Sequence, residues 1–444
     1  MGNESRIIES RLGRLGKLGL IAGGIAGGAL SEGARQLIQG RRPTLGSALF
    51  SSANASRLSS SLAEMRGAAM KLGQLLSMES GELLPPELAQ ALTRLRDNAH
   101  VVPLGQVAAV LKQSWGEEWD KKFRHFNFQP LAAASIGQVH FAERADGREL
   151  AIKIQYPGIR RSIDSDVDNV AALLRTLHLI PGEIEIQPLL DDAKIQLHAE
   201  ANYLQEAAYL KRFAQLTGGD DRYAVPAVDD ELTTSEVLAM QYLDGEPIES
   251  LVDSQRTLRN QVGTTLLELG LREVFDWGLV QTDPNFANFR YNSLNGAVQL
   301  LDFGATRAYS DATRAALGNL LRAGMDGSDS DLLREAAAVG YIDENDPNSY
   351  KRGVLFLLRT ATEPARSGSD YDFGRSDLAR RISDTVLELR LNTRYGRLPP
   401  ADVLFLHRKL GGLYLLFSRL HASVPVRQLL IQILEDEVAS VKNI

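Results

Sequence analysis

The sequence of 444 residues is longer than a single hydrophobic core usually supports, so it predicts two or more packed units. Its 49 basic and 56 acidic residues give a net charge of −7, which argues against a broad basic face for nucleic acid. The absence of cysteine excludes disulfides, zinc–thiolate sites, iron–sulfur clusters and cysteine nucleophiles.

Residues 1–45 form a basic N-terminal segment that is rich in glycine and other small residues. Gly19, Gly23 and Gly27 would lie in one stripe on a helix, which favours close contact with a second helix, such as that of a second copy in a homodimer. A flexible segment or a tightly packed helix of a globular protein explains the same glycines equally well. Basic residues beside leucines also favour a helix lying on a membrane surface: Arg11, Leu12, Arg14, Leu15, Lys17 and Leu18.

No secretory signal or lipid anchor is expected at this end. The apolar run at residues 18–30 is broken by glycines and is followed by no convincing cleavage pattern. It is also shorter than the roughly 20 residues that a bilayer requires. Arg6 stands where a myristoylation signal has serine or threonine.

The remainder predicts an α+β fold in three further parts. Residues 46–124 are expected to form a helical extension, because Leu62, Met65, Ala69, Leu72 and Leu76 recur with helical spacing. Residues 125–245 predict a smaller lobe containing a sheet, and residues 246–444 predict a mostly helical lobe. The smaller lobe has strand-like runs at 149–155 and 236–242 and helical segments at 166–178 and 194–213. The larger lobe has short β-like runs near residue 279 and at 298–301.

The most informative segment is QTDPNFANFRYNSLNGAVQLLDFGATR, at residues 281–307. Asp283 and Asn288 lie in a polar loop, and Asp302 opens an Asp-Phe-Gly triplet after an apolar strand. This is the spacing of a kinase-type catalytic loop and its metal-binding triplet. Asp283 is the candidate for positioning or deprotonating a phosphoryl acceptor, while Asn288 and Asp302 are candidates for holding magnesium. Each residue alone is better explained as a turn or cap residue, so only their joint spacing indicates a site.

Lys153 closes an Ala-Ile-Lys tripeptide in a strand, where kinases place the lysine that binds the α- and β-phosphates. A lysine in an otherwise apolar strand must be paired or functional. Glu206 shares one helical face with Tyr203, Leu210 and Phe213, so its carboxylate faces inward. Because an unpaired buried charge is costly, a Lys153–Glu206 ion pair is expected. The alternative is a Glu206 side chain that only rims the helix.

Several blocks in chain order resemble the UbiB family, also called ABC1, AarF, ADCK or Coq8-like, of atypical kinase-like proteins linked to ubiquinone biosynthesis. The resemblance covers nearly everything from about residue 60 to 420. Its K-x-G-Q motif and alanine-rich loop are absent from ordinary protein kinases, which makes the match specific. The matching blocks are Lys71-Leu72-Gly73-Gln74, the alanine-rich loop at 132–139, Ala-Ile-Lys at 151–153, the loop at 281–288, LLDFGATR at 300–307 and LHRKLGGLYLL at 406–416.

The resemblance implies an atypical protein-kinase-like fold with two lobes, binding Mg²⁺ and ATP between them, and an N-terminal helical extension over the cleft. It also implies ATPase-like activity instead of protein phosphorylation. An alanine loop keeps its N–H donors, but each methyl group limits close approach to phosphate. The expected nucleotide contacts of this region are Ala132, Ala133, Ala134, Ser135, Gly137, Gln138 and Lys153.

By the same resemblance, Lys71 and Gln74 are regulatory residues on a helix that blocks the protein-substrate site. Lys71 would pair with Glu200, the first carboxylate of an E-x-D motif. This chain has Asn202 at the third position of that motif, which places any charge-based role of the position in doubt. Asparagine can still donate and accept hydrogen bonds.

The hinge segment that would meet adenine is expected at residues 240–243. Met240, Gln241 and Leu243 are the candidate contacts, although a buried methionine more often fills a core. Two features differ from a signalling kinase: Gln-Thr-Asp replaces His-Arg-Asp, and no Ala-Pro-Glu motif follows Gly304. A platform for a peptide substrate is therefore not expected.

The resulting hypothesis is a Mg-ATP-dependent ATPase, with catalytic residues Lys153, Glu206 and Asp283, that supports ubiquinone or related prenyl-lipid metabolism. Two alternatives stay open: a genuine kinase of a lipid or small molecule, and an ATP-gated lipid-binding scaffold without essential catalysis. Expected partners are ATP, a lipid or prenylphenol ligand and a membrane surface, but not nucleic acid.

The expected location is the bacterial cytoplasm beside the inner membrane, or the mitochondrial matrix for a eukaryotic chain. Charged residues in the last apolar region argue against membrane insertion there: Arg408, Lys409, Arg419 and Arg427.

Overall fold

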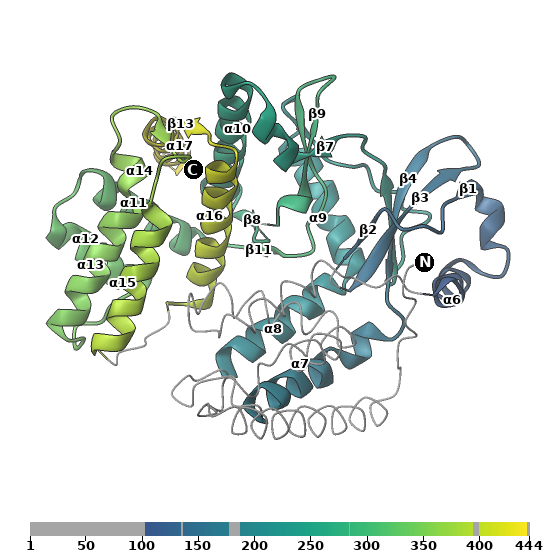
Figure 1. Cartoon of the computed structure of the whole chain (residues 1–444), viewed down its shortest axis with the longest axis horizontal. Helices are drawn as coiled ribbons and strands as arrows, with labels where there is room; N and C mark the ends of the chain where they lie inside the picture. The colour runs from purple at the N-terminus through teal and green to yellow at the C-terminus, as the bar shows by residue number, and fades with distance from the viewer. Residues whose placement is uncertain (1–102, 135, 177–186, 284, 394–398, 442–444) are drawn as a thin grey trace, which may run out of the picture. The chain divides into compact units, whose positions relative to one another are not determined.

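A computed structural model of the chain describes residues 103–134, 136–176, 187–283, 285–393 and 399–441. They belong to two compact units (Figure 1). The first unit contains the described residues up to Ala208 together with Ala227–Tyr242, and the second contains Tyr209–Pro226 and the described residues from Leu243 onward. The N-terminal segment 1–45 and most of the helical extension lie outside the described residues, so those predictions stay open, as does the four-part division.

The first unit is built on a five-stranded sheet with the order β1-β3-β4-β6, in which β2 pairs with β3. All of its pairings are antiparallel, and β4 is hydrogen-bonded on both sides. The predicted strand at 149–155 is confirmed, and the one at 236–242 is confirmed over 237–241. The strands are β1 (Phe123–Phe126), β2 (Ala132–Ala133), β3 (Gly137–Arg144), β4 (Glu149–Gln155) and β6 (Val237–Gln241).

One face of this sheet is covered by helix α6 (Leu104–Trp115), with the short η1 (Trp119–Lys122) beside it. Val107, Val110 and Leu111 share one side of α6 and are buried against alternate residues of β4 in a single core. Successive side chains of a strand point to opposite faces. Because Leu150, Ile152 and Ile154 face the core, Lys153 faces away from α6.

Three further helices follow β4: α7 (Ile159–Thr176), α8 (Gln187–Glu200) and α9 (Tyr203–Leu216). The predicted single helix at 194–213 was wrong, because the chain leaves helical geometry at residues 201–202. The Asn202 side chain accepts a hydrogen bond from the Gln205 N–H at 3.3 Å. It therefore caps the first turn of α9, the role in which asparagine competes with a continuous helix.

The second unit is organised around α10 (Arg256–Phe275), which packs against α16 (Ala401–Arg419) and α17 (Val426–Val441) (Figure 1). Helix α10 is buried around much of its circumference. Gly270 allows a close approach to α16, because a Cβ atom there would lie 2.9 Å from Leu413 Cδ1. The other helices are η2 (Ile248–Asp253), η3 (Phe286–Asn288), α11 (Asp311–Asp326), α12 (Asp329–Val339), α13 (Asn348–Ala361), α14 (Glu363–Arg366) and α15 (Leu378–Thr393).

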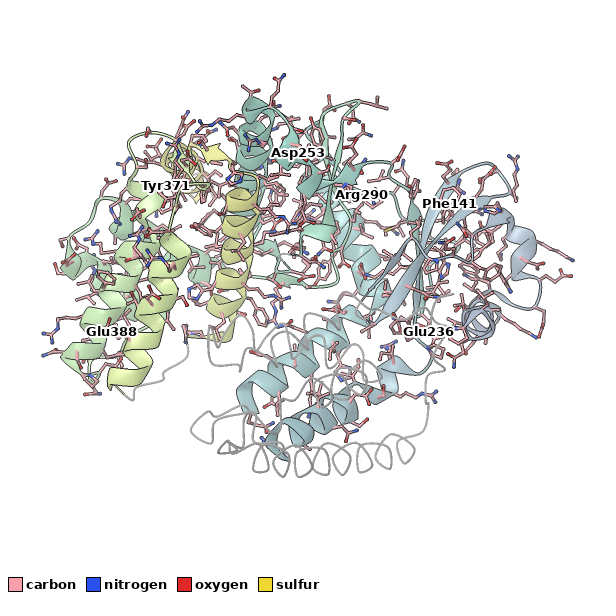
Figure 2. All side chains as sticks on the ribbon, in the orientation of Figure 1. Phe141, Glu236, Asp253, Arg290, Tyr371 and Glu388 are labelled. Atoms are coloured by element: carbon pink, nitrogen blue, oxygen red, sulfur yellow. The ribbon has the colours of Figure 1, made fainter. Side chains whose placement is uncertain are left out.

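Short strands of the second unit carry the predicted catalytic-loop segment at residues 281–307. A four-stranded sheet has the order β5-β10-β9-β7, and β8 pairs with β11. Arg290, labelled in Figure 2, donates from Nε to the Gly245 carbonyl at 2.6 Å and so ties β9 to the entry of β7. The strands are β5 (Tyr223–Ala224), β7 (Glu246–Pro247), β8 (Leu279–Gln281), β9 (Phe289–Asn292), β10 (Ala297–Leu300), β11 (Thr306–Ala308), β12 (Tyr371–Asp372) and β13 (Ser423–Val424).

Across the described ranges, no helix combines the length and the apolar character needed to cross a bilayer. Helix α16 contains Arg408 and Lys409 in its middle, and both side chains are buried. Arg427, in α17, instead donates to Asp326 at 2.8 Å. These charges therefore interact within the second unit.

Candidate active site

The predicted ion pair between Lys153 and Glu206 is confirmed. Lys153 Nζ donates to both carboxylate oxygens of Glu206, at 2.7 and 3.0 Å. Both side chains are almost fully removed from solvent, with exposed fractions of 8% and 0%. In such surroundings each charge depends on the other, because an isolated buried ion is costly.

One aromatic contact and one hydrogen bond to the backbone lie beside this ion pair. The ring centroid of Tyr203, in the first turn of α9, lies 5.2 Å from Lys153 Nζ, within cation–π range. Gln155, two positions further along the same face of β4, donates from Nε2 to the Ala201 carbonyl at 2.8 Å. The break between α8 and α9 thereby anchors the strand that carries Lys153.

The alanine-rich loop forms a hairpin between β2 and β3. Ala132 and Ala133 are exposed, and the Ala134 N–H donates to the Gly137 carbonyl at 2.8 Å. A Cβ atom on Gly137 would lie 2.3 Å from the Ile154 carbonyl oxygen, so only glycine fits against β4 there. The other predicted nucleotide contacts of this loop are Gln138, which is buried, and Ser135, which lies outside the described residues.

The predicted hinge begins inside β6. Met240 is buried and paired with Ala151, and the N–H groups of Gln241 and Tyr242 donate to the carbonyls of Ala227 and Glu149. These two donors are therefore already used within the first unit. Adenine contacts by Met240, Gln241 and Leu243 remain a prediction.

The catalytic-loop segment lies entirely in the second unit. Asp283 follows β8, and its two carboxylate oxygens have different partners. Arg408 Nη2 donates to Oδ1 at 2.8 Å, and Asn288 Nδ2 donates to Oδ2 at 3.1 Å. The structure thus brings Asp283 and Asn288 together, as predicted, and adds Arg408.

The Asp-Phe-Gly triplet is held by its own backbone and by aromatic packing. Asp302 Oδ1 accepts the Gly304 N–H at 3.0 Å. Phe303 is buried, with its ring centroid 4.4 Å from that of Phe213. The Leu301 N–H donates to the Asn288 carbonyl at 3.0 Å, which links the triplet to the catalytic loop.

A cavity of about 10 Å³, close to the volume of one water-sized probe, lies beside this triplet. Asn288 and Asp302 both line it. An amide and a carboxylate supply the oxygen ligands that Mg²⁺ prefers, and Mg²⁺ usually fills its remaining positions with substrate phosphates and water. Within the described residues no group of three or more His, Asp or Glu side chains is arranged to hold a metal alone. The donor oxygens of Asn288 and Asp302 therefore fit a magnesium ion that takes its other ligands from phosphate and water, although the cavity itself has room for only about one water-sized probe.

The same cavity is lined by Glu273, Gln281 and Lys409, which the sequence motifs did not predict as site residues. Lys409 Nζ lies 2.9 Å from Glu273 Oε2, and both side chains are 2% exposed. A signal for Arg408 and Lys409 was present in the sequence, because charged residues stand in an otherwise apolar helix. Lys409, like Lys153, is a lysine in an otherwise apolar segment and must be paired or functional.

A profile of the ABC1 atypical kinase-like domain matches residues 94–336. The chain belongs to the ABC1 atypical kinase-like family. It is 36% identical over 428 residues to the atypical kinase COQ8B, mitochondrial, of Rattus norvegicus, a match covering 96% of this chain and 81% of the relative. It is 35% identical over 448 residues to the atypical kinase coq-8, mitochondrial, of Caenorhabditis elegans, covering 98% of this chain and 59% of that relative.

A solved structure supports the same family fold. The complex of Rv3197 with erythromycin, from Mycobacterium tuberculosis, aligns with a TM-score of 0.59 and 28% sequence identity. The alignment covers 84% of this chain and 94% of that chain. The predicted α+β, atypical kinase-like fold is thereby confirmed.

Of the three predicted regulatory residues, only Glu200 lies within the described ranges. Lys71 and Gln74 lie outside the described residues. Glu200 is the last residue of α8 and is partly buried, directly before the turn that contains Asn202. The pairing of Lys71 with Glu200 therefore stays a prediction, whereas Asn202 has a defined structural role as the cap of α9.

Proposed function

We propose that this ABC1 protein binds Mg²⁺ and ATP and hydrolyses ATP to ADP and phosphate. The observation that carries the proposal is the buried Lys153–Glu206 pair, in which both carboxylate oxygens hold one ammonium group. A lysine fixed in this way is oriented to bind phosphate oxygens. Family membership and the Asp283, Asn288 and Asp302 arrangement support the same reading.

Each residue has a defined part in this reaction. Lys153 would bind the α- and β-phosphates while Glu206 orients it, and Asn288 and Asp302 would hold the ion. Bound Mg²⁺ would neutralise charge on the phosphate oxygens and orient the γ-phosphoryl group. Asp283 would orient the attacking water and accept its proton as the bond between the γ-phosphorus and the bridging oxygen breaks. Its hydrogen bonds to Arg408 and Asn288 leave lone pairs for that water.

An analysis of reaction products tests this activity. Purified protein is incubated with Mg²⁺ and γ-labelled ATP, with and without liposomes that contain a phenolic lipid. Release of free labelled phosphate, lost in Asp302→Asn, is the expected result. Label recovered on the lipid would support a genuine kinase instead. Equal hydrolysis by wild type and Asp302→Asn would contradict the proposal.

We further propose that the activity supports ubiquinone or related prenyl-lipid metabolism, with a lipid or prenylphenol as ligand and a membrane surface as partner. The proposal rests on the family resemblance and on relatives named as mitochondrial. A mitochondrial matrix location follows if the chain is eukaryotic, and a bacterial inner-membrane location otherwise. Deleting the gene should lower ubiquinone, and wild type should restore it. Full restoration by Asp302→Asn would favour a scaffold without essential catalysis.

A further inference from the structure

Glu273, near the end of α10, and Lys409, in α16, form an ion pair that the proposed reaction does not use. The two Lys409 Nζ contacts to Glu273 measure 2.9 and 3.2 Å. Burial raises the pKa of the Glu273 carboxyl, and the Lys409 ammonium offsets part of that increase. Placing two charges in the core of the second unit is expensive, so the pair needs an explanation.

The pair is connected to the start of the catalytic loop. Glu273 Oε2 accepts the backbone N–H of Gln281 at 3.1 Å. Gln281 is the last residue of β8, and Asp283 follows two positions later. On the other edge of this segment, the Thr282 hydroxyl donates to the Ala305 carbonyl at 2.7 Å. Glu273 thus holds the backbone N–H of Gln281 where the loop begins, alongside the pairing of β8 with β11.

Stability alone is a weak explanation for such a pair. Replacing a buried ion pair with apolar residues of similar size is often neutral or stabilising. The apolar replacement would, however, remove the acceptor of the Gln281 N–H. The Gln281 side chain is also buried, and neither of its polar atoms has a hydrogen-bond partner within the described ranges. It lines the cavity shared by Asn288 and Asp302. The position of Gln281 therefore affects the surroundings of both proposed metal ligands.

We propose that Glu273 and Lys409 are a positioning pair for phosphoryl transfer: Lys409 keeps the Glu273 carboxylate in place, and Glu273 fixes the backbone at Gln281. This inference deepens the proposed function and rests on it. The neighbouring Arg408 holds Asp283 directly, so adjacent residues of α16 secure two points of the loop. Loss of the pair should reduce the turnover rate more than nucleotide affinity, because the proposed reaction gives neither side chain a contact with the phosphates.

Two double variants of the full chain separate positioning from packing. Glu273→Met/Lys409→Met removes both charges and the acceptor for Gln281. Glu273→Gln/Lys409→Met also removes both charges but keeps a side-chain oxygen that can accept the Gln281 N–H. A matched control, Glu363→Gln/Arg381→Met, removes the half-exposed pair that joins α14 to α15. All are measured well below their unfolding temperatures.

The readouts are hydrogen exchange of the backbone at residues 279–288, kcat, and Kd for the Mg²⁺ complex of a nucleotide. In the Met/Met variant, the backbone hydrogens of residues 279–288 should exchange about 10-fold faster and kcat should fall about 10-fold. Its Kd should change by less than about 3-fold. The Gln/Met variant should recover most of both losses. The control should change neither quantity.

Equal rates of hydrogen exchange at residues 279–288 in the two double variants would overturn the positioning role. Faster exchange in the Met/Met variant with an unchanged kcat would overturn it as well. Failure of the proposed function is distinguished by the wild type. If wild type and Asp302→Asn turn over ATP equally, the ATPase proposal fails. The exchange comparison then still decides whether Glu273 fixes the backbone at Gln281.

Discussion

At Lys153 a full positive charge lies in a strand whose neighbours Ile152 and Ile154 belong to the hydrophobic core. The charge is tolerated because Glu206 supplies two acceptor oxygens and Tyr203 presents its ring. Removing one partner leaves an uncompensated buried charge, whereas removing both does not. Stability and nucleotide binding can therefore be separated at this site by mutation.

Lys153→Met is expected to lower the free energy of unfolding by about 3–5 kcal/mol, because the buried Glu206 carboxylate loses the ammonium group that both of its oxygens contact. The double variant Lys153→Met/Glu206→Leu should recover most of that stability but neither nucleotide binding nor ATP turnover. Urea unfolding and calorimetric nucleotide titration measure the two effects. Lys112→Met, which removes an exposed pair with Glu117, is the control and should cost less than about 1 kcal/mol. Turnover restored in the double variant would contradict a phosphate-binding role for Lys153.

Asp302→Asn is expected to lower Mg²⁺-dependent ATP turnover by about 100-fold or more, since the proposed magnesium ligand loses its charge. The fold should be retained, because an asparagine oxygen can still accept the Gly304 N–H. Steady-state kinetics over a range of Mg²⁺ concentrations measure the loss. Asp326→Asn, which weakens the contact with Arg427 away from the proposed site, is the matched control. Unchanged turnover in Asp302→Asn would remove Asp302 from the proposed machinery.

At the scale of elements, the break between α8 and α9 sets where Glu206 lies. Helix α9 begins at Tyr203, so Glu206 lies in its first turn and shares a helical face with that tyrosine. The Asn202 cap satisfies one of the N–H groups that have no partner within a helix. Asparagine and aspartate are about equally good as N-cap residues. Asn202 therefore caps α9 even though the E-x-D motif has aspartate at this position.

Asn202→Ala is expected to lower the free energy of unfolding by about 0.5–2 kcal/mol through loss of the cap. Asn202→Asp should be neutral or slightly stabilising, because a negative charge is favourable at a helix N-terminus. Denaturant unfolding of the three proteins measures this order. Gln215→Ala, at an exposed position near the other end of α9, should change stability by no more than about 0.5 kcal/mol. A loss in Asn202→Asp equal to that in Asn202→Ala would exclude the capping role.

At the scale of the whole molecule, each unit contains part of the predicted nucleotide machinery. The first contains the phosphate-binding candidate Lys153 with Glu206, and the second contains Asp283, Asn288 and Asp302. Substitutions of Lys153 and of Asp302 are each expected to weaken nucleotide binding. A ligand that binds only folded protein raises its stability by an amount set by ligand concentration and Kd.

Mg²⁺ with ADP, at about 100 times its Kd, should stabilise the folded chain by about 2.7 kcal/mol. This corresponds to roughly 5–10 °C in the unfolding midpoint for units of this size. Excess EDTA should remove most of the increase. Asp302→Asn should show little Mg²⁺-dependent increase, while Asp326→Asn should behave as wild type. An increase of the same size in EDTA would contradict magnesium binding by Asn288 and Asp302. Differential scanning calorimetry, which resolves separate transitions of two units, is the appropriate measurement.

The sequence predicted the elements and residues whose signals are local. Strand β4 and the inward face of Glu206 followed from periodicity, and the grouping of Asp283 with Asn288 followed from motif spacing. The break at Asn202 was missed because helical spacing of apolar residues continues across it. Lys409 was read only as a charge unsuited to a membrane, because its partner Glu273 is distant along the chain.

The amino-acid sequence by itself determined the α+β class and the types of residue available to hold phosphate and magnesium, while its resemblance to the ABC1 family implied the kinase-like fold. Those properties depend on short-range patterns, such as alternation along a strand and the spacing of a loop motif. Only the tertiary structure decided which buried charges neutralise each other and which side chain supports the catalytic loop. The physical reason is that Coulombic and hydrogen-bond energies depend on distance in space and on burial, and folding determines both for Glu273, Arg408 and Lys409.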